Sequence, residues 1–276
     1  MNNLRPLALV TGASSGIGYE LARLFAADGY DLVLTATGTN DGLSRTSEAA
    51  TAAGAACTAI EADLTKPEDV EHLATSIEKI GRPLDAAALN AGLGLGGYFI
   101  GGTSFANEMK LMQLNAISQV HLTKLILPAM VSRGQGRILY TASISGTMPT
   151  PYEAVYGATK AFLISFVEAV RAEISESGVS LTLLLPGEVD TNFWHRAGMD
   201  TSKLGLGPKA APTKVAEEGY GAMKGGKDRV VAGKADSKFI GNIVNALLPD
   251  KTTAALHAKG AKPGSGLPEH DKLTNK

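Results

Sequence analysis

The sequence has a single cysteine, Cys57, among its 276 residues. One cysteine excludes a disulfide framework within the chain, and it equally excludes a zinc site made of several cysteines. No Asp or His cluster has the spacing of metal ligands, so we expect no metal site. We interpret Cys57 as a small apolar residue near a strand.

Net charge and long apolar runs are also lacking. The 26 basic and 27 acidic residues give a formal net charge of −1, which offers no electrostatic reason to expect nucleic acid or an anionic membrane as a partner. No run of about 18 apolar residues is present to span a membrane, and the apolar stretch at the N-terminus is too short for a secretory signal. We therefore expect a cytoplasmic protein without nucleic-acid or membrane partners.

Short apolar runs alternate with longer amphipathic stretches along the chain. The runs predict strands at 7–10, 32–35, 86–89, 137–141, 180–185 and 229–231. The stretches between them predict helices at about 16–28, 67–80, 104–132, 156–177 and 213–225. Buried strands that alternate with helices favour a parallel sheet covered on both faces. We predict one α/β domain over 1–256, with a doubly wound sheet of about seven strands, followed by a disordered polar tail over 257–276.

A long connection at 188–212 interrupts this alternation and contains the only tryptophan. Connections of this length in a compact domain are usually functional or disordered. We interpret this one as a substrate loop. Its residues Phe193, Trp194 and Met199 are expected either to form an apolar lid over the substrate or to anchor the loop on the domain.

The motif TGASSGIG at 11–18 follows a strand pattern and opens a helix pattern. Glycine permits a tight turn there, and the N-terminus of the helix presents free N–H groups to a pyrophosphate. We therefore predict a dinucleotide cofactor on this turn. The residues assigned to it are Gly12, Ser14, Ser15, Gly16, Ile17 and Gly18.

The same letters also fit a second interpretation. Residues 12–16 match G-x-S-x-G, the nucleophile turn of α/β-hydrolases, in which Ser14 would attack and His195 or His257 would act as base. That turn normally follows a central strand well into the chain, whereas this one follows the first strand. Cofactor binding is therefore favoured, and His195 is expected to face solvent.

Tyr156 and Lys160 are four residues apart, which places them on one face of a helix. An ammonium near a phenol lowers the tyrosine pKa from about 10, and this predicts an acid/base at Tyr156. Ser143 follows the strand at 137–141, and ligands of doubly wound sheets bind at the carboxyl ends of the strands. Its hydroxyl is therefore expected to hold a substrate oxygen.

These motifs occur in order together with Asn90-Ala91-Gly92, Asn115 and Pro186-Gly187-x-Val189-x-Thr191. Over about residues 5–235 the chain resembles the short-chain dehydrogenase/reductase family. The resemblance implies that Tyr156 is the acid/base, that Lys160 also binds the nicotinamide ribose, and that Ser143 holds the substrate oxygen. It further implies that Asn115 keeps a water linking Lys160 to solvent, although a buried structural amide is the alternative.

The resemblance also assigns cofactor contacts. Asp63 and Leu64 match the adenine position. Residues 90–92 (Asn90, Ala91 and Gly92) match the position near the adenosine ribose, and a purely structural role that joins neighbouring strands is the alternative for Asn90. The segment beside nicotinamide and pyrophosphate is matched by Pro186, Gly187, Val189 and Thr191.

The choice between NAD and NADP depends on the end of the second strand. Counting from the first glycine leads to Asp31, but this residue begins that strand and is interpreted as a strand-edge residue. The strand ends with neither an acid nor a base, and Thr37, Thr39 and Asn40 offer hydrogen bonds to a 2′-phosphate. NADP is therefore favoured over NAD.

The function implied is an NAD(P)-dependent oxidoreductase that interconverts a carbonyl and a secondary alcohol. A protein that binds the dinucleotide without turnover is the alternative. The family resemblance further implies a homodimer or homotetramer formed through the helices around Asn115 and 156–173. The substrate is a small molecule that the sequence does not name.

Overall fold

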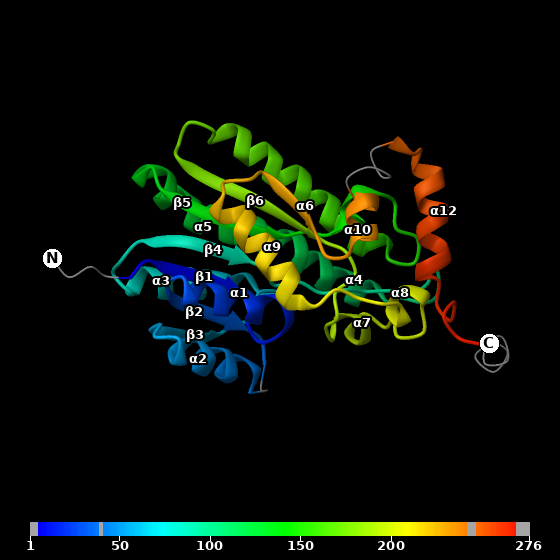
Figure 1. Ribbon diagram of the computed structural model, residues 1–276, viewed down its shortest axis with the longest axis horizontal. Helices are drawn as coiled ribbons and strands as arrows, with labels where there is room; N and C mark the ends of the chain where they lie inside the picture. Colours follow the sequence, from blue (N-terminus) through cyan, green and yellow to red (C-terminus); the bar gives the residue numbers. More distant parts are fainter. Residues whose placement is uncertain (1–4, 39–40, 242–246, 269–276) are drawn as a thin grey trace.

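Seven parallel strands form one sheet in the computed structural model, which describes residues 5–38, 41–241 and 247–268 (Figure 1). The strands are β1 (Leu7–Thr11), β2 (Asp31–Ala36), β3 (Cys57–Glu61), β4 (Leu84–Leu89), β5 (Gly136–Thr141), β6 (Val179–Pro186) and β7 (Arg229–Ala232). Their order is β3-β2-β1-β4-β5-β6-β7. Because the order reverses between β1 and β4, a ligand crevice is expected at the carboxyl ends of these strands. The predicted doubly wound α/β fold is confirmed.

Helices cover both faces of the sheet. On one face α3 (Pro67–Lys79), α5 (Ser118–Arg133) and α6 (Ala154–Glu173) bury aliphatic side chains such as Leu73 and Leu163. On the other face lie α1 (Gly16–Ala27), α2 (Gly42–Ala52) and α9 (Pro212–Lys224), where the ring of Phe25 packs edge-on against Tyr220. The strands therefore contribute to two cores, which explains their nearly continuous apolar sequence. Among the described helices, none is both long and apolar enough to cross a membrane.

Strand β3, helix α2 and the long helix predicted over 104–132 differ from the sequence prediction. Helix α2 was not predicted because it buries only the narrow face formed by Gly42, Thr46 and Ala50, and its other positions are mostly small or polar. The predicted helix over 104–132 is divided into α4 (Phe105–Met112), a π-helical turn η1 (Gln113–Ile117) and α5. Single π-helical turns inside α-helices are frequent at functional sites, and this one carries Asn115.

Short helices gather at the end of the molecule away from the N-terminus (Figure 1). They are α7 (Phe193–Arg196), α8 (Lys203–Leu206), α10 (Ala235–Phe239) and α12 (Asp250–Ala261). The prediction of a disordered tail from residue 257 is wrong as far as residue 268, because α12 continues to Ala261, which is buried against Ala197 and Met199. The remainder of the predicted tail, 269–276, lies outside the described residues.

Candidate active site

A cavity of about 370 Å³ lies at the carboxyl ends of the strands and gathers most of the predicted site residues. Those that line it are Gly12, Ser14, Ser15, Gly16, Ile17, Thr37, Leu64, Asn90, Ala91, Gly92, Ser143, Tyr156, Lys160, Pro186, Gly187, Val189 and Thr191. Gly18, Asp63 and Asn115 do not line it. Parallel topology produces this convergence, because every strand ends at the same edge of the sheet.

The turn between β1 and α1 has the backbone geometry of a phosphate site. Gly12 and Gly16 have φ angles of 64° and 57°, in the left-handed region that favours glycine. A Cβ on Gly18 would overlap the carbonyl oxygen of Gly12 and lie 2.7 Å from Nδ2 of Asn90. Gly18 therefore acts by close packing of α1 on the turn, while Gly12 and Gly16 face the cavity. This cradle fits the pyrophosphate of a dinucleotide.

Asn90 joins three strands. Its Nδ2 donates to the carbonyl oxygen of Thr11 at 3.2 Å, and its Oδ1 accepts a hydrogen bond from Oγ1 of Thr141 at 3.1 Å. Its backbone N–H donates to Oγ1 of Thr11. The amide is thus a structural link among β1, β4 and β5 at the floor of the cavity, as the structural interpretation of Asn90 expected.

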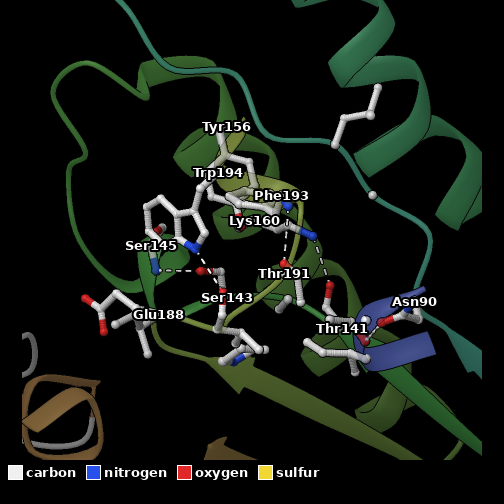
Figure 2. Close-up of a pocket in the computed structure, with 18 of the residues that line it drawn as sticks. Asn90, Thr141, Ser143, Ser145, Tyr156, Lys160, Glu188, Thr191, Phe193 and Trp194 are labelled. Atoms are coloured by element: carbon white, nitrogen blue, oxygen red, sulfur yellow. Dashed lines mark hydrogen bonds between the residues drawn. The ribbon is translucent and has the colours of Figure 1, made fainter. Parts of the chain in front are cut away.

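Tyr156, Lys160 and Ser143 lie together along the cavity (Figure 2). Nζ of Lys160 donates to the carbonyl oxygen of Thr141 at 2.9 Å and lies 5.8 Å from the centre of the Tyr156 ring. Ser143 precedes the 3-10 helix η2 (Ile144–Thr147), and its Oγ accepts the N–H of Ser145 at 3.1 Å. Two different elements, helix α6 and the end of β5, therefore bring the predicted catalytic side chains to one place.

Burial dominates the electrostatics of this group. Burial raises the pKa of Tyr156 above its usual value, a hydrogen bond with Ser143 opposes that shift, and the negative charge of Glu153 adds to it. Burial also lowers the pKa of Lys160 to about 8, since the charged ammonium loses hydration. The pKa of Tyr156 is thus raised rather than lowered as expected, since burial of the phenol is the largest cause and Lys160 is not among the causes.

The side chain of Asn115 is fully engaged in structural hydrogen bonds. Its Oδ1 accepts the N–H of Leu93 at 2.9 Å, and its Nδ2 donates to the carbonyl oxygen of Leu93 at 2.9 Å and to Oγ1 of Thr159 at 3.3 Å. A Cβ on Gly92 would lie 3.3 Å from Oδ1 of Asn115 and 3.4 Å from Nζ of Lys160. Asn115 thus holds the loop after β4 close to Lys160, and its role in a proton relay stays a prediction.

The connection at 188–212 contributes side chains both to the cavity lining and to its own anchoring on the domain. The ring of Phe193 lies 5.5 Å from that of Tyr156, centre to centre, and Nε1 of Trp194 donates to the carbonyl oxygen of Val189 at 2.9 Å (Figure 2). Both side chains line the cavity, whereas the side chain of Met199 is buried. Met199 and the hydrogen bond of Trp194 fit the anchoring interpretation, and a lid over the substrate stays a prediction.

The two ends of β2 have different roles. Asp31, at the start, accepts a hydrogen bond from Arg82 at 2.7 Å and another from the N–H of Ala56 at 2.9 Å. Burial raises the pKa of Asp31, but these hydrogen bonds and the charges of Arg82 and Arg5 together hold it below its usual value. Asp31 is thus a strand-edge residue, as expected. Thr37 at the other end lines the cavity, while 39–40 lie outside the described residues.

Asp63 has a local structural role in this structure. Its Oδ1 accepts hydrogen bonds from the N–H of Thr65 at 3.1 Å and from Oγ1 of the same residue at 2.7 Å. Its own N–H donates to Asp69. The neighbouring Leu64 lines the cavity instead, so an adenine contact by Asp63 stays a prediction.

The two histidines required by the hydrolase interpretation have other partners. His195 has 84% of its side chain exposed, and its Nδ1 lies 3.0 Å from Oδ2 of Asp200. His257 bonds Glu153. Ser14 belongs to the glycine turn at the dinucleotide end of the cavity, which argues against a nucleophilic role. Over the described residues there is no group of three or more His, Cys, Asp or Glu side chains that could hold a metal ion.

Sequence reasoning missed one wall of the cavity. Glu153, Thr253, Leu256, His257 and Gly260 line it as well. The four residues of α12 carry no motif, and their proximity to Tyr156 depends on how the end of the chain folds back. No local sequence signal could have placed them there.

A parallel sheet with a glycine cradle beside a buried Tyr, Lys and Ser group defines a dinucleotide-dependent enzyme, and comparison with known proteins gives its family. The family described as short chain dehydrogenase matches residues 6–201. A ketoacyl reductase, HetN, from Nostoc sp. is 32% identical over 227 residues, which cover 81% of this chain and 77% of that protein. The chain belongs to the short-chain dehydrogenase family and is an NAD(P)-dependent oxidoreductase.

Other relatives agree with this assignment. The 1-deoxy-11-beta-hydroxypentalenate dehydrogenase of Streptomyces exfoliatus is 35% identical over 187 residues, 67% of each chain. A solved short-chain dehydrogenase from Sphingobium yanoikuyae in complex with NADPH is 25% identical, with a TM-score of 0.74 over 98% of this chain and 96% of that one. An alcohol dehydrogenase from Thermococcus sibiricus complexed with 5-hydroxy-NADP has a TM-score of 0.72 at 25% identity, over 83% of this chain and 97% of that one.

Proposed function

We propose that the protein reduces a carbonyl group to a secondary alcohol, or catalyses the reverse oxidation, with Tyr156 as acid/base. The observation that carries this proposal is the meeting of Tyr156, Ser143 and Lys160 in the cavity that also contains the glycine cradle. When bound, the nicotinamide cofactor supplies or accepts the hydride.

The residues of the chain divide the remaining work. The hydroxyl of Ser143 is placed to hold the substrate oxygen, and the phenol of Tyr156 gives its proton to that oxygen or takes it back. Lys160, held by the carbonyl of Thr141, would bind the ribose and supply positive charge beside the phenol. Phe193 covers the Tyr156 ring and excludes water from the reacting group.

The cradle and the strand ends would hold the cofactor, and we favour NADP over NAD. Gly12 and Gly16 bring the backbone to the phosphates, and Thr37 offers a hydroxyl at the end of β2. Solved structures of the same fold hold NADPH, 5-hydroxy-NADP or NAD, so the preference rests on the residues at the end of β2. No acidic residue follows β2 directly, so electrostatic repulsion of a 2′-phosphate is small.

The first test compares binding of NADPH and NADH by nicotinamide fluorescence, with quenching of Trp194 as a second signal. We expect tighter binding of NADPH, followed by turnover of members of a carbonyl panel. Equal or reversed affinities would contradict the NADP preference, and binding of neither would contradict the function itself.

A second candidate function is binding of the dinucleotide without any reaction. Measurement of turnover distinguishes this candidate from an oxidoreductase. The buried Tyr156, which is hydrogen-bonded to Ser143, favours the enzyme over the non-catalytic candidate. A protein that only binds the cofactor needs no acid/base tyrosine. NADPH consumption with a carbonyl substrate, absent in Tyr156→Phe, would establish the enzyme.

We also propose a homodimer or homotetramer formed through α5 and α6. The apolar side chains of Ile117, Leu125 and Phe162 are exposed on η1 and these helices. Light scattering of the purified protein tests this, and a monomer at micromolar concentration would contradict it.

A further inference from the structure

A buried hydrogen bond joins the C-terminal helix α12 to the residue that precedes helix α6. Nε2 of His257 lies 3.0 Å from Oε2 of Glu153, and only 4% of each side chain is exposed. Glu153 stands three residues before Tyr156. A carboxylate in so buried a place is costly unless it is paired, so each residue holds the other in position.

The backbone on the Glu153 side is held firmly. Tyr152 has a φ of 69°, the left-handed region that bulky residues rarely adopt. Its carbonyl oxygen accepts the N–H of Gly97 at 2.8 Å, and its ring packs edge-on against Tyr98 with 5.2 Å between centres. Such a conformation persists only where its surroundings enforce it. Glu153 is therefore a fixed attachment point for His257.

Helix α12 and the substrate loop form one packed unit. Oγ of Ser265 accepts the N–H of Lys203 at 3.0 Å, and Oγ1 of Thr201 accepts the N–H of Gly264 at 3.1 Å. A Cβ on Gly260 would lie 3.0 Å from Cγ of Leu204, so the two segments are in close contact. We call the segments 193–206 and 250–267 together the C-terminal cap.

The cap faces the cavity with an apolar wall. The cap residues that line the cavity are the apolar Phe193, Trp194, Leu204 and Leu256, together with Gly260 and the polar Arg196, Thr253 and His257, of which Arg196 is exposed. The wall begins beside Tyr156, because the ring of Phe193 lies 5.5 Å from that of Tyr156, centre to centre. A subsite with such walls favours an apolar substituent of the substrate rather than a charged one.

We propose that α12 forms the wall of a subsite for the apolar part of the carbonyl substrate, and that the buried Glu153–His257 pair positions this wall against the catalytic helix. His257 is a positioning residue, because it reaches the substrate only through the placement of α12. The inference rests on the proposed carbonyl reduction for its substrate class. The attachment of α12 by the pair is independent of it.

The test removes the pair without removing bulk. His257→Phe keeps a ring but leaves no hydrogen bond to Glu153, whereas His257→Gln retains an N–H donor. The matched control is His195→Phe, which removes an exposed pair with Asp200 on the same cap. Because His257→Phe also buries an unpaired Glu153, NADPH affinity and the unfolding midpoint are measured first to establish that each variant is folded.

Hydrogen exchange and ketone kinetics give the readouts. For His257→Phe we expect exchange of the α12 amides to rise by about tenfold or more. KM for methyl octyl ketone should rise about tenfold, with little change in KM for butanone or in NADPH affinity. His257→Gln should recover most of the wild-type behaviour, and His195→Phe should match the wild type. Unchanged exchange, or a KM increase that is equal for both ketones, would overturn the proposal.

Leu256→Ala gives a second test, because it leaves the Glu153–His257 pair intact. Leu256 is 51% exposed, so its truncation should not unfold the protein. We expect KM for methyl octyl ketone to rise in Leu256→Ala while KM for butanone stays constant. If KM for methyl octyl ketone is the same in the variant and the wild type, α12 does not form the wall of the subsite. If no ketone is turned over, binding of methyl octyl ketone by Trp194 fluorescence separates the cases. If the wild type binds methyl octyl ketone and both His257→Phe and Leu256→Ala bind it more weakly, the subsite is supported although the proposed carbonyl reduction is not. If the wild type does not bind this ketone, the subsite proposal is overturned.

Discussion

Replacement of Gly18 by alanine should weaken dinucleotide binding although Gly18 does not line the cavity. Gly18 lies in the first turn of α1, where a Cβ would overlap the carbonyl oxygen of Gly12 and lie 2.7 Å from Nδ2 of Asn90. Both neighbours belong to the floor of the phosphate site. Because a backbone carbonyl cannot rotate away as a side chain can, α1 and the turn must separate.

The size of the effect follows from two opposing contributions. Alanine in a helix is ordinarily favoured over glycine by about 0.5–1 kcal/mol. Overpacking costs about 1–3 kcal/mol, and a rigid backbone contact places Gly18→Ala toward the upper end of that range. The net cost of Gly18→Ala is therefore about 1–2 kcal/mol. Because this cost distorts the turn that would bind the phosphates, the Kd for NADPH should rise about tenfold.

Gly221→Ala is the matched control. Gly221 also lies within a helix, α9, but a Cβ there would meet nothing within 4 Å. This variant should be more stable than the wild type by about 0.5–1 kcal/mol and bind NADPH unchanged. The assays are fluorescence titration with NADPH and urea unfolding. A Gly18→Ala protein that binds as the wild type does, or gains as much stability as Gly221→Ala, would refute the reasoning.

Further predictions concern single side chains. Tyr156→Phe should lower turnover by about 10²–10⁴-fold while NADPH affinity stays constant, and comparable turnover would remove Tyr156 from its role. Thr37→Asp places a carboxylate where we expect the 2′-phosphate, so the ratio of NADPH to NADH affinity should fall; an unaltered ratio would place the phosphate elsewhere. Burial and, to a smaller extent, the charge of Glu153 raise the pKa of Tyr156, so Glu153→Gln should move the pH profile of alcohol oxidation to lower pH, and an unmoved profile would speak against that coupling. The folded-state pKa of Asp31 is lowered, so its pairing with Arg82 stabilises the fold above about pH 3.8 and is lost as the pH falls below it. Asp31→Asn should therefore be less stable than the wild type in urea at neutral pH, by roughly 1–3 kcal/mol, with the difference vanishing in acid, and an equal stability at neutral pH would contradict this.

Local patterns in the sequence were sufficient for much of the fold and the cofactor cradle. Strands buried on both faces must be apolar along their length, and a turn that approaches phosphate needs glycine at Gly12 and Gly16. The four-residue spacing of Tyr156 and Lys160 places them on one helix face in any context. Each of these inferences rests on the geometry of neighbouring residues, so the sequence by itself determined them.

Other features were decided only by tertiary packing. Glu153 and His257 are 104 residues apart, and no periodicity relates them. The raised pKa of Tyr156 comes first from burial, which depends on the elements packed around α6. The side-chain amide of Asn115 hydrogen-bonds the backbone of Leu93, because the π-helical turn η1 places Asn115 next to the loop after β4. Burial and partner choice arise from the simultaneous packing of distant segments, and this is why the cap wall and the proton affinities required the structure.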